Sequence, residues 1–107
     1  AINRALDHMG GEKMNKYETM FILNPDLEDE TTEKMIAKVE DTVNEHEGEI
    51  VNMDQWGTRE LAYEIEDHGA GYYTVINFEG TAATVNELER IYRINDSILR
   101  FITLRDE

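Results

Sequence analysis

The chain has 107 residues, the length of one ordinary domain, and 32% of them are charged. Lysine and arginine number 10 against 24 aspartates and glutamates, so the formal net charge is −14. The absence of cysteine excludes disulfides, thiolate metal sites and thiol nucleophiles, and it fits a reducing compartment. No run of about 18 apolar residues occurs, so the sequence predicts no membrane-spanning helix.

Residues 1–13 differ in character from the rest of the chain. They contain Gly10-Gly11, precede Met14 and lack the apolar centre of a secretory signal. We interpret residues 1–13 as a disordered leader or cloning remnant and residues 14–107 as a single domain, with a native ordered arm as the alternative. The leader carries two charges of each sign, so the domain alone keeps the net charge of −14.

The first half of the domain predicts a strand and then a helix. Tyr17–Leu23 is rich in strand-forming residues and ends at Asn24-Pro25, so we expect a buried central strand with apolar side chains on both faces. Acidic residues at 28–33 favour a helix start, because the macrodipole attracts negative charge there. Gly48 is expected to end this helix. The apolar stripe of the helix comprises Met35, Ile36, Val39 and Val43.

The middle of the chain predicts a long hairpin. Ile50–Met53 begins a second strand, Gly57 indicates a bulge or bend, and Leu61–Ile65 resumes extended structure. The polar, glycine-containing segment 66–71 predicts the turn, and Tyr72–Phe78 predicts the third strand.

The last third predicts a helix and a final strand. The helix begins at Thr81 or, alternatively, at Thr84, where Glu87 would complete a capping box. Residues 98–104 form the fourth strand. The order strand, helix, strand, strand, helix, strand is that of the ferredoxin-like α+β fold (βαββαβ), in which two helices cover one face of a four-stranded antiparallel sheet. The stripe of the second helix comprises Val85, Leu88, Ile91 and Tyr92.

The sequence lacks the signatures of an enzyme. Ser97 is the only serine, and no base is placed to activate it. His46 and His68 have no third ligand at metal spacing and are expected on the solvated surface. The acidic residues at 26–30 lack the alternating ligands and mid-loop glycine of a calcium loop. The chain is therefore expected to have no catalytic residue, no metal site and no cofactor.

An RNA-recognition motif shares this element order and stacks bases on aromatic side chains of its third strand. When residues 70–77 are laid on that consensus, Gly71, Tyr72 and Val75 fit, and the other four informative positions do not. Stacking of single-stranded bases on this sheet is therefore disfavoured.

Positive charge within the fold is scarce and mostly arginine, whose planar guanidinium can contact phosphate oxygens bidentately. We expect these cations to gather in one RNA-binding patch; the alternative is that each pairs with a neighbouring carboxylate. The candidate RNA-binding residues are Lys16, Arg59, Arg90, Arg93, Arg100 and Arg105.

Exposed sheet edges are a second candidate for function. A four-stranded ferredoxin-like sheet leaves two edge strands, and an edge can pair with another chain. We expect the second strand to be the edge that binds a partner, through Met53, Gln55 and Trp56. Trp56 could equally be a packing residue, and both roles can hold together.

Four ordered pieces of sequence carry a family resemblance: Tyr17-Glu18 before the stop at Asn24-Pro25, the segment Trp56-Gly57-Thr58-Arg59-Glu60-Leu61-Ala62-Tyr63, then Gly71-Tyr72-Tyr73, and finally Arg93-Ile94-Asn95-Asp96-Ser97-Ile98-Leu99-Arg100. In this order and spacing the chain resembles the bacterial small-subunit ribosomal protein S-six family, from Met14 to Arg105.

This resemblance implies a structural protein of the small ribosomal subunit in the cytoplasm. It implies binding to the central domain of the small-subunit ribosomal RNA as a heterodimer with the basic ribosomal protein S-eighteen, with no membrane or small-molecule substrate. A basic companion would supply the cations that an anionic chain needs to approach phosphates. Glu60 and Glu66-Asp67 depart from the family pattern, because members often carry bases there.

Two other functions are compatible with the same fold. A regulatory or oligomerising module that binds a small molecule would need a glycine-lined ligand site, and a small enzyme would need an ionisable cluster in a cleft. The sequence indicates neither of them.

Overall fold

The computed structural model describes residues 14–65 and 67–106, so the prediction that residues 1–13 form a disordered leader lies outside the described residues. Six elements succeed one another along these residues. They are β1 (Asn15–Leu23), α2 (Asp29–Glu45), β2 (Glu49–Ile65), β3 (His68–Gly80), α3 (Ala82–Ile94) and β4 (Ile98–Asp106).

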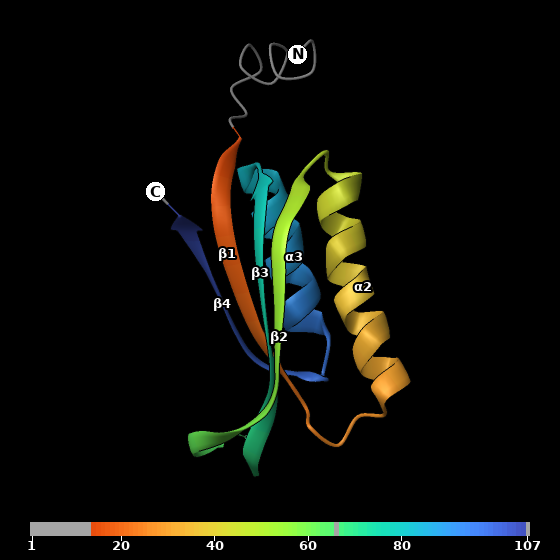
Figure 1. Cartoon of the computed structure of the whole chain (residues 1–107), viewed down its shortest axis with the longest axis vertical. Coiled ribbons are helices and arrows are strands. Elements are labelled where there is room, and N and C mark those ends of the chain that lie inside the picture. The colour runs from red at the N-terminus through yellow and green to blue at the C-terminus, as the bar shows by residue number, and fades with distance from the viewer. Residues whose placement is uncertain (1–13, 66, 107) are drawn as a thin grey trace.

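The four strands form one antiparallel sheet in the order β2-β3-β1-β4. Both helices lie on the same side of this sheet, and its other face is open (Figure 1). The predicted ferredoxin-like fold is confirmed, with β1 in the interior of the sheet and β2 and β4 at its edges. No helix among the described residues is long and apolar enough to cross a membrane.

The core lies between the sheet and the helices. On β1, alternate side chains point to the two faces of the sheet; Phe21 and Leu23, which face the helices, have no exposed surface. The apolar stripes that three-to-four spacing predicts on α2 and α3 pack against these strand side chains. The buried core comprises Phe21, Leu23, Met35, Ile36, Val39, Val43, Ile76, Phe78, Leu88, Ile91, Tyr92 and Ile98.

Helix α2 ends in a Schellman motif whose left-handed residue lies one position before the predicted glycine. The Glu47 N–H donates to the Asn44 carbonyl at 3.1 Å, and the Gly48 N–H donates to the Val43 carbonyl at 2.8 Å. The left-handed position is Glu47, with φ 63°. Gly48 is needed for another reason, because a Cβ there would come within 2.6 Å of the Glu79 carbonyl oxygen.

Helix α3 begins after Thr81, the first of the two predicted starts. The Thr81 hydroxyl accepts the Thr84 backbone N–H at 3.4 Å, so Thr81 is the N-cap and Thr84 lies inside the first turn. The alternative start at Thr84 is wrong, because the backbone is already helical from Ala82 and the Thr84 N–H is one of the donors that the cap satisfies.

The β2–β3 hairpin is longer than predicted. β2 has 17 residues and β3 has 13, against nine each in β1 and β4, so the end of the hairpin extends past the rest of the sheet and bends away from the helices (Figure 1). The predicted bulge at Gly57 is confirmed by a register shift and a φ of 81°. Of the three register shifts in this hairpin, the last separates the pair Glu60 and Ala70 from the pair Ile65 and His68, so residues 61–64 leave the regular ladder.

Candidate partner and nucleic-acid interface

The open face of the sheet is built from three rows of side chains that run across β3, β1 and β4. Strand register and the alternation of side chains place each row on the face away from the helices. The rows are Asn77, Glu18 and Leu104; then Val75, Met20 and Ile102; then Tyr73, Ile22 and Arg100. Apolar side chains therefore occupy the middle of a face that nothing in the described chain covers.

Two adjoining hollows lie on this face, with volumes of about 120 Å³ and about 190 Å³. Met20 lines both hollows, and we call them together the sheet trough. The smaller hollow is lined by Glu18, Met20, Trp56, Val75, Ile102 and Leu104. The larger hollow is lined by Met20, Ile22, Leu61, Ala62, Tyr63, Ile65, Tyr73 and Arg100.

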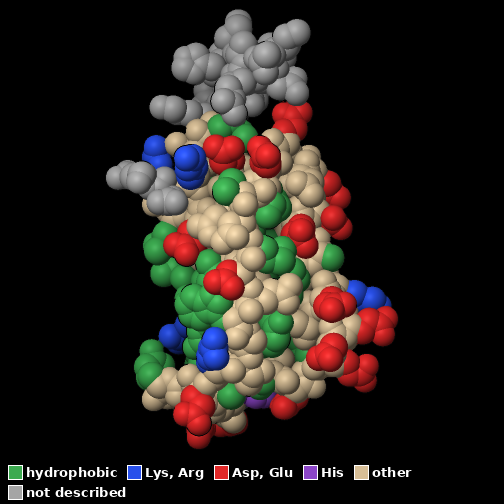
Figure 2. All heavy atoms as spheres, viewed as in Figure 1, with side chains coloured by type: hydrophobic (Ala, Val, Ile, Leu, Met, Phe, Trp, Pro, Cys, Tyr) green, Lys and Arg blue, Asp and Glu red, His purple; other side chains and the backbone are tan. Residues whose placement is uncertain are grey.

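Figure 2 shows hydrophobic side chains gathered along the side of the molecule opposite the helices, with basic side chains toward the lower end of that patch. Several side chains of the trough are strongly exposed: Trp56 is 43% exposed, Ile102 47% and Leu104 53%. Sequence reasoning missed Ile102 and Leu104 as interface candidates. The signal was present, because residues 98–104 carry apolar side chains in both alternating positions.

The three predicted partner-binding residues of β2 do not share a face of the sheet. Trp56 lies on the open face, and Met53 and Gln55 lie on the face toward the helices. The Trp56 ring stacks on Tyr73 with centroids 5.9 Å apart, and its Nε1 donates to Asp54 Oδ2 at 2.9 Å. Met53 packs against the core, and Gln55 Oε1 accepts the Tyr72 hydroxyl at 2.9 Å. Of the three, Trp56 alone lines the sheet trough.

Arg100 lies at the hairpin end of the trough. Its Nη1 donates to the Tyr63 hydroxyl at 3.3 Å, and its Cζ lies 5.9 Å from the centroid of the Tyr63 ring. Tyr63 is 65% exposed, so this contact, rather than burial, positions the ring. Arg59 is exposed and pairs with Gly71 in the hairpin ladder, which places it near the same end of the sheet.

Arg93 and Arg105 lie along the flank formed by α3 and β4. The Arg93 Cζ lies 5.8 Å from the centroid of the Phe101 ring, and its Nη2 lies 3.7 Å from Glu89 Oε1. Arg105 Nη2 donates to Asn15 Oδ1 at 2.9 Å. Both side chains remain exposed, so their guanidinium groups can reach a ligand in solution.

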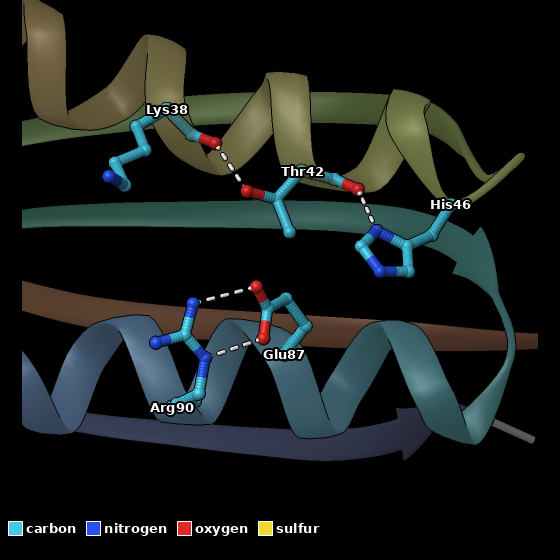
Figure 3. Close-up of polar contacts among 5 residues, drawn as sticks. All are labelled: Lys38, Thr42, His46, Glu87 and Arg90. Atoms are coloured by element: carbon cyan, nitrogen blue, oxygen red, sulfur yellow. Dashed lines mark hydrogen bonds and ion pairs between the residues drawn. The ribbon is translucent and has the colours of Figure 1, made fainter.

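Arg90 faces a groove between α2 and α3 (Figure 3). Its Nε and Nη2 donate to the two carboxylate oxygens of Glu87 at 2.7 and 2.8 Å. This pairing lowers the pKa of Glu87 and raises the pKa of Arg90, because each charged form stabilises the other. On the facing helix, the Thr42 hydroxyl donates to the Lys38 carbonyl and His46 Nδ1 donates to the Thr42 carbonyl.

The six predicted RNA-binding cations therefore do not form one patch. Arg59 and Arg100 lie toward the hairpin end, Arg93 and Arg105 lie on the flank, and Arg90 lies between the helices. Lys16 is exposed on β1, between Glu79 of β3 and Asp106 of β4. Among the described residues, no group of three His, Cys, Asp or Glu side chains could hold a metal ion.

Comparison with known proteins agrees with this fold. Residues 16–105 match the model of the family described as Ribosomal protein S6. The chain is 43% identical over 94 residues to small ribosomal subunit protein bS6 of Caldanaerobacter subterraneus subsp. tengcongensis, covering 88% of this chain and 99% of that protein. It is 44% identical to the bS6 protein of Clostridium novyi, with the same coverage.

A solved structure extends the likeness to three dimensions. The crystal structure of 30S ribosomal protein S6 from Thermotoga maritima superposes with a TM-score of 0.83 at 36% identity, covering 88% of this chain and 89% of that one. These relatives are proteins of the small ribosomal subunit, which is cytoplasmic in bacteria. The chain therefore belongs to the ribosomal protein S6 family, the S-six family that its sequence resembles, whose members are structural and not enzymatic.

Proposed function

We propose that this structural ribosomal protein binds the central domain of the small-subunit ribosomal RNA as a heterodimer with the basic ribosomal protein S-eighteen. The observation that carries the proposal is the uncovered sheet trough on a chain whose net charge is −14. The identities of the RNA and of the companion come from the family resemblance.

The exposed apolar side chains support a protein companion. Contiguous apolar patches larger than a few hundred Å² are rare on monomeric proteins, and such patches are typical of interaction sites. Trp56, Ile102 and Leu104 are all exposed and line one hollow. A companion that covered them would remove apolar surface from water, at roughly 25 cal/mol for each Å² buried.

The net charge supports a companion that is basic. Phosphate groups repel an anionic protein, and RNA binding requires cations that displace condensed counterions. Arg93 and Arg105 on the flank, with Arg59 on the hairpin, are the side chains of this chain that we propose for phosphate contact. The companion would supply the remaining positive charge.

The test compares three samples by size-exclusion chromatography and filter binding: the chain with S-eighteen, the chain with a central-domain RNA fragment, and all three together. We expect a stable heterodimer and RNA binding by the heterodimer, with weak RNA binding by the chain alone. The logarithm of the affinity should fall with the logarithm of salt concentration by about 0.9 for each duplex phosphate contacted. Failure to form the heterodimer, or RNA affinity that is independent of salt, would contradict the proposal.

A further inference from the structure

We propose that the sheet trough holds an amphipathic helix of the companion, and that Arg100 and Glu18 select the charges this helix carries. The helix would bear a carboxylate opposite Arg100 and a cation opposite Glu18, with apolar side chains between them. This inference rests on the proposed function, because it assumes a protein companion, and it adds the chemistry of the segment that docks.

The dimensions of the trough suit one helix. Its two hollows adjoin along β1 and share Met20. The face spans three strand spacings from β2 to β4, about 14 Å, which is close to the diameter of about 10–12 Å of an α-helix with its side chains. Glu18 and the row of Arg100 lie four residues apart along β1, about 13 Å, or roughly two and a half helical turns.

The basic end of the trough has a guanidinium without an anionic partner. Among the described residues, Arg100 makes no ion pair, and its hydrogen bond goes to the neutral Tyr63 hydroxyl. Arg90 and Arg93, in contrast, each have a glutamate beside them. An incoming carboxylate could therefore pair with Arg100 without displacing one that is already bound.

The opposite end of the trough is acidic. Glu18 lines the smaller hollow and is exposed, and Asp54 accepts the Trp56 indole N–H nearby. These carboxylates favour a lysine or arginine on the docked segment and repel phosphate. This favours a peptide over RNA as the occupant of the trough.

Trp56 provides a direct probe, because it is the only tryptophan of the chain and it lines the trough. Two synthetic amphipathic helical peptides of equal net charge would be titrated while Trp56 emission is recorded. One carries a glutamate and a lysine at the two ends of its apolar face; the other carries lysine at both ends, with the balancing charges on the far face. We expect the mixed-charge peptide to bind up to about fivefold more tightly, as for an exposed ion pair.

Two variants test the role of Arg100. Arg100→Glu should reverse the order of the two peptides, because both ends of the trough are then acidic. Arg90→Glu makes the same charge change on α3, on the other side of the sheet, and it should keep the wild-type order. Equal binding of both peptides, no response of Trp56 to either, or equal effects of the two variants would overturn the inference.

Two further measurements separate this inference from the proposed function. If S-eighteen binds the wild-type chain and Arg100→Glu weakens the heterodimer more than Arg90→Glu does, the inference is supported. If S-eighteen binds all three equally, the inference fails and the proposed function stands; if it does not bind the wild-type chain, the proposed function fails. A single-stranded oligonucleotide should leave Trp56 emission unchanged, and a shift would assign the trough to nucleic acid instead.

Discussion

Arg90 and Glu87 form a bidentate pair one turn apart on α3, with N···O distances of 2.7 and 2.8 Å. On the same helix, Arg93 Nη2 lies 3.7 Å from Glu89 Oε1, a longer contact, and the Arg93 guanidinium lies over the Phe101 ring. Two arginines three residues apart therefore differ in what they can offer a ligand. The guanidinium of Arg90 is already matched by a carboxylate, and that of Arg93 is more available.

We predict that Arg93→Ala weakens RNA binding by the heterodimer and lowers the salt slope by about 0.9, the value for one phosphate contact. Arg90→Ala is the matched control and should change the slope little, because its guanidinium is engaged by Glu87. Filter binding over a salt series measures both. Heterodimer formation should be unaffected by either variant; a larger effect of Arg90→Ala on RNA binding would contradict the assignment.

The buried Tyr92 hydroxyl predicts a loss of stability at alkaline pH. It lies 2.9 Å from Thr19 Oγ1, and burial raises the pKa of Tyr92 above its ordinary value near 10, although the hydrogen bond to Thr19 opposes this shift. Because the folded state binds this proton more tightly than the unfolded state, the contribution to stability is complete below about pH 10 and falls as pH rises above it.

Tyr92→Phe should therefore reduce the alkaline loss of stability and cost about 1 kcal/mol at neutral pH, the typical net contribution of one hydrogen bond. Urea denaturation at neutral and at alkaline pH measures both effects. Tyr63→Phe, which alters an exposed tyrosine, is the control. An alkaline limb that is the same in Tyr92→Phe and in the wild type would show that Tyr92 does not cause it.

Gly71 and Gly69 on β3 offer a paired test of close packing. A Cβ at Gly71 would collide with Ile22 Cγ2, and a Cβ at Gly69 would meet nothing within 4 Å. Gly71→Ala should destabilise the fold by about 1–3 kcal/mol, as overpacking does. Gly69→Ala should stay within about 0.5 kcal/mol of the wild type. Chemical denaturation measures both, and equal stabilities would mean that the sheet adjusts without cost.

Glu47 at the end of α2 predicts a stabilising substitution. Its φ of 63° lies in the left-handed region, which costs a residue with a Cβ more than it costs glycine. Glu47→Gly should raise the free energy of unfolding by about 0.5–1 kcal/mol. Glu45→Gly, at the last helical residue, should lower it by up to about 1 kcal/mol. Thermal unfolding of both variants checks the signs, and a loss of stability in Glu47→Gly would refute the prediction.

Local signals in the amino-acid sequence were sufficient to predict the six elements and their order. The stripe of Met35, Val39 and Val43 has helical spacing, and Asn24-Pro25 stops the first strand. Prediction was less accurate where two signals compete. Gly69 and Gly71 suggested a wide turn, yet both lie in β3. Gly71 pairs with Arg59 in the ladder, and its missing Cβ leaves room for Ile22 Cγ2, a close approach that only the tertiary structure reveals.

Which side chains share a surface depended instead on contacts between distant parts of the chain. Met20 of β1, Trp56 of β2 and Ile102 of β4 are far apart in sequence and line one hollow, because strand order and register bring them together. Arg90 and Arg93 are three residues apart on α3, yet Arg90 lines the groove beside α2 and Arg93 lies over the Phe101 ring of β4. The composition gives the number of charges in a chain. Their arrangement on the surface depends on the pairing of strands and the packing of helices that are distant in sequence. This arrangement determines what the surface can bind.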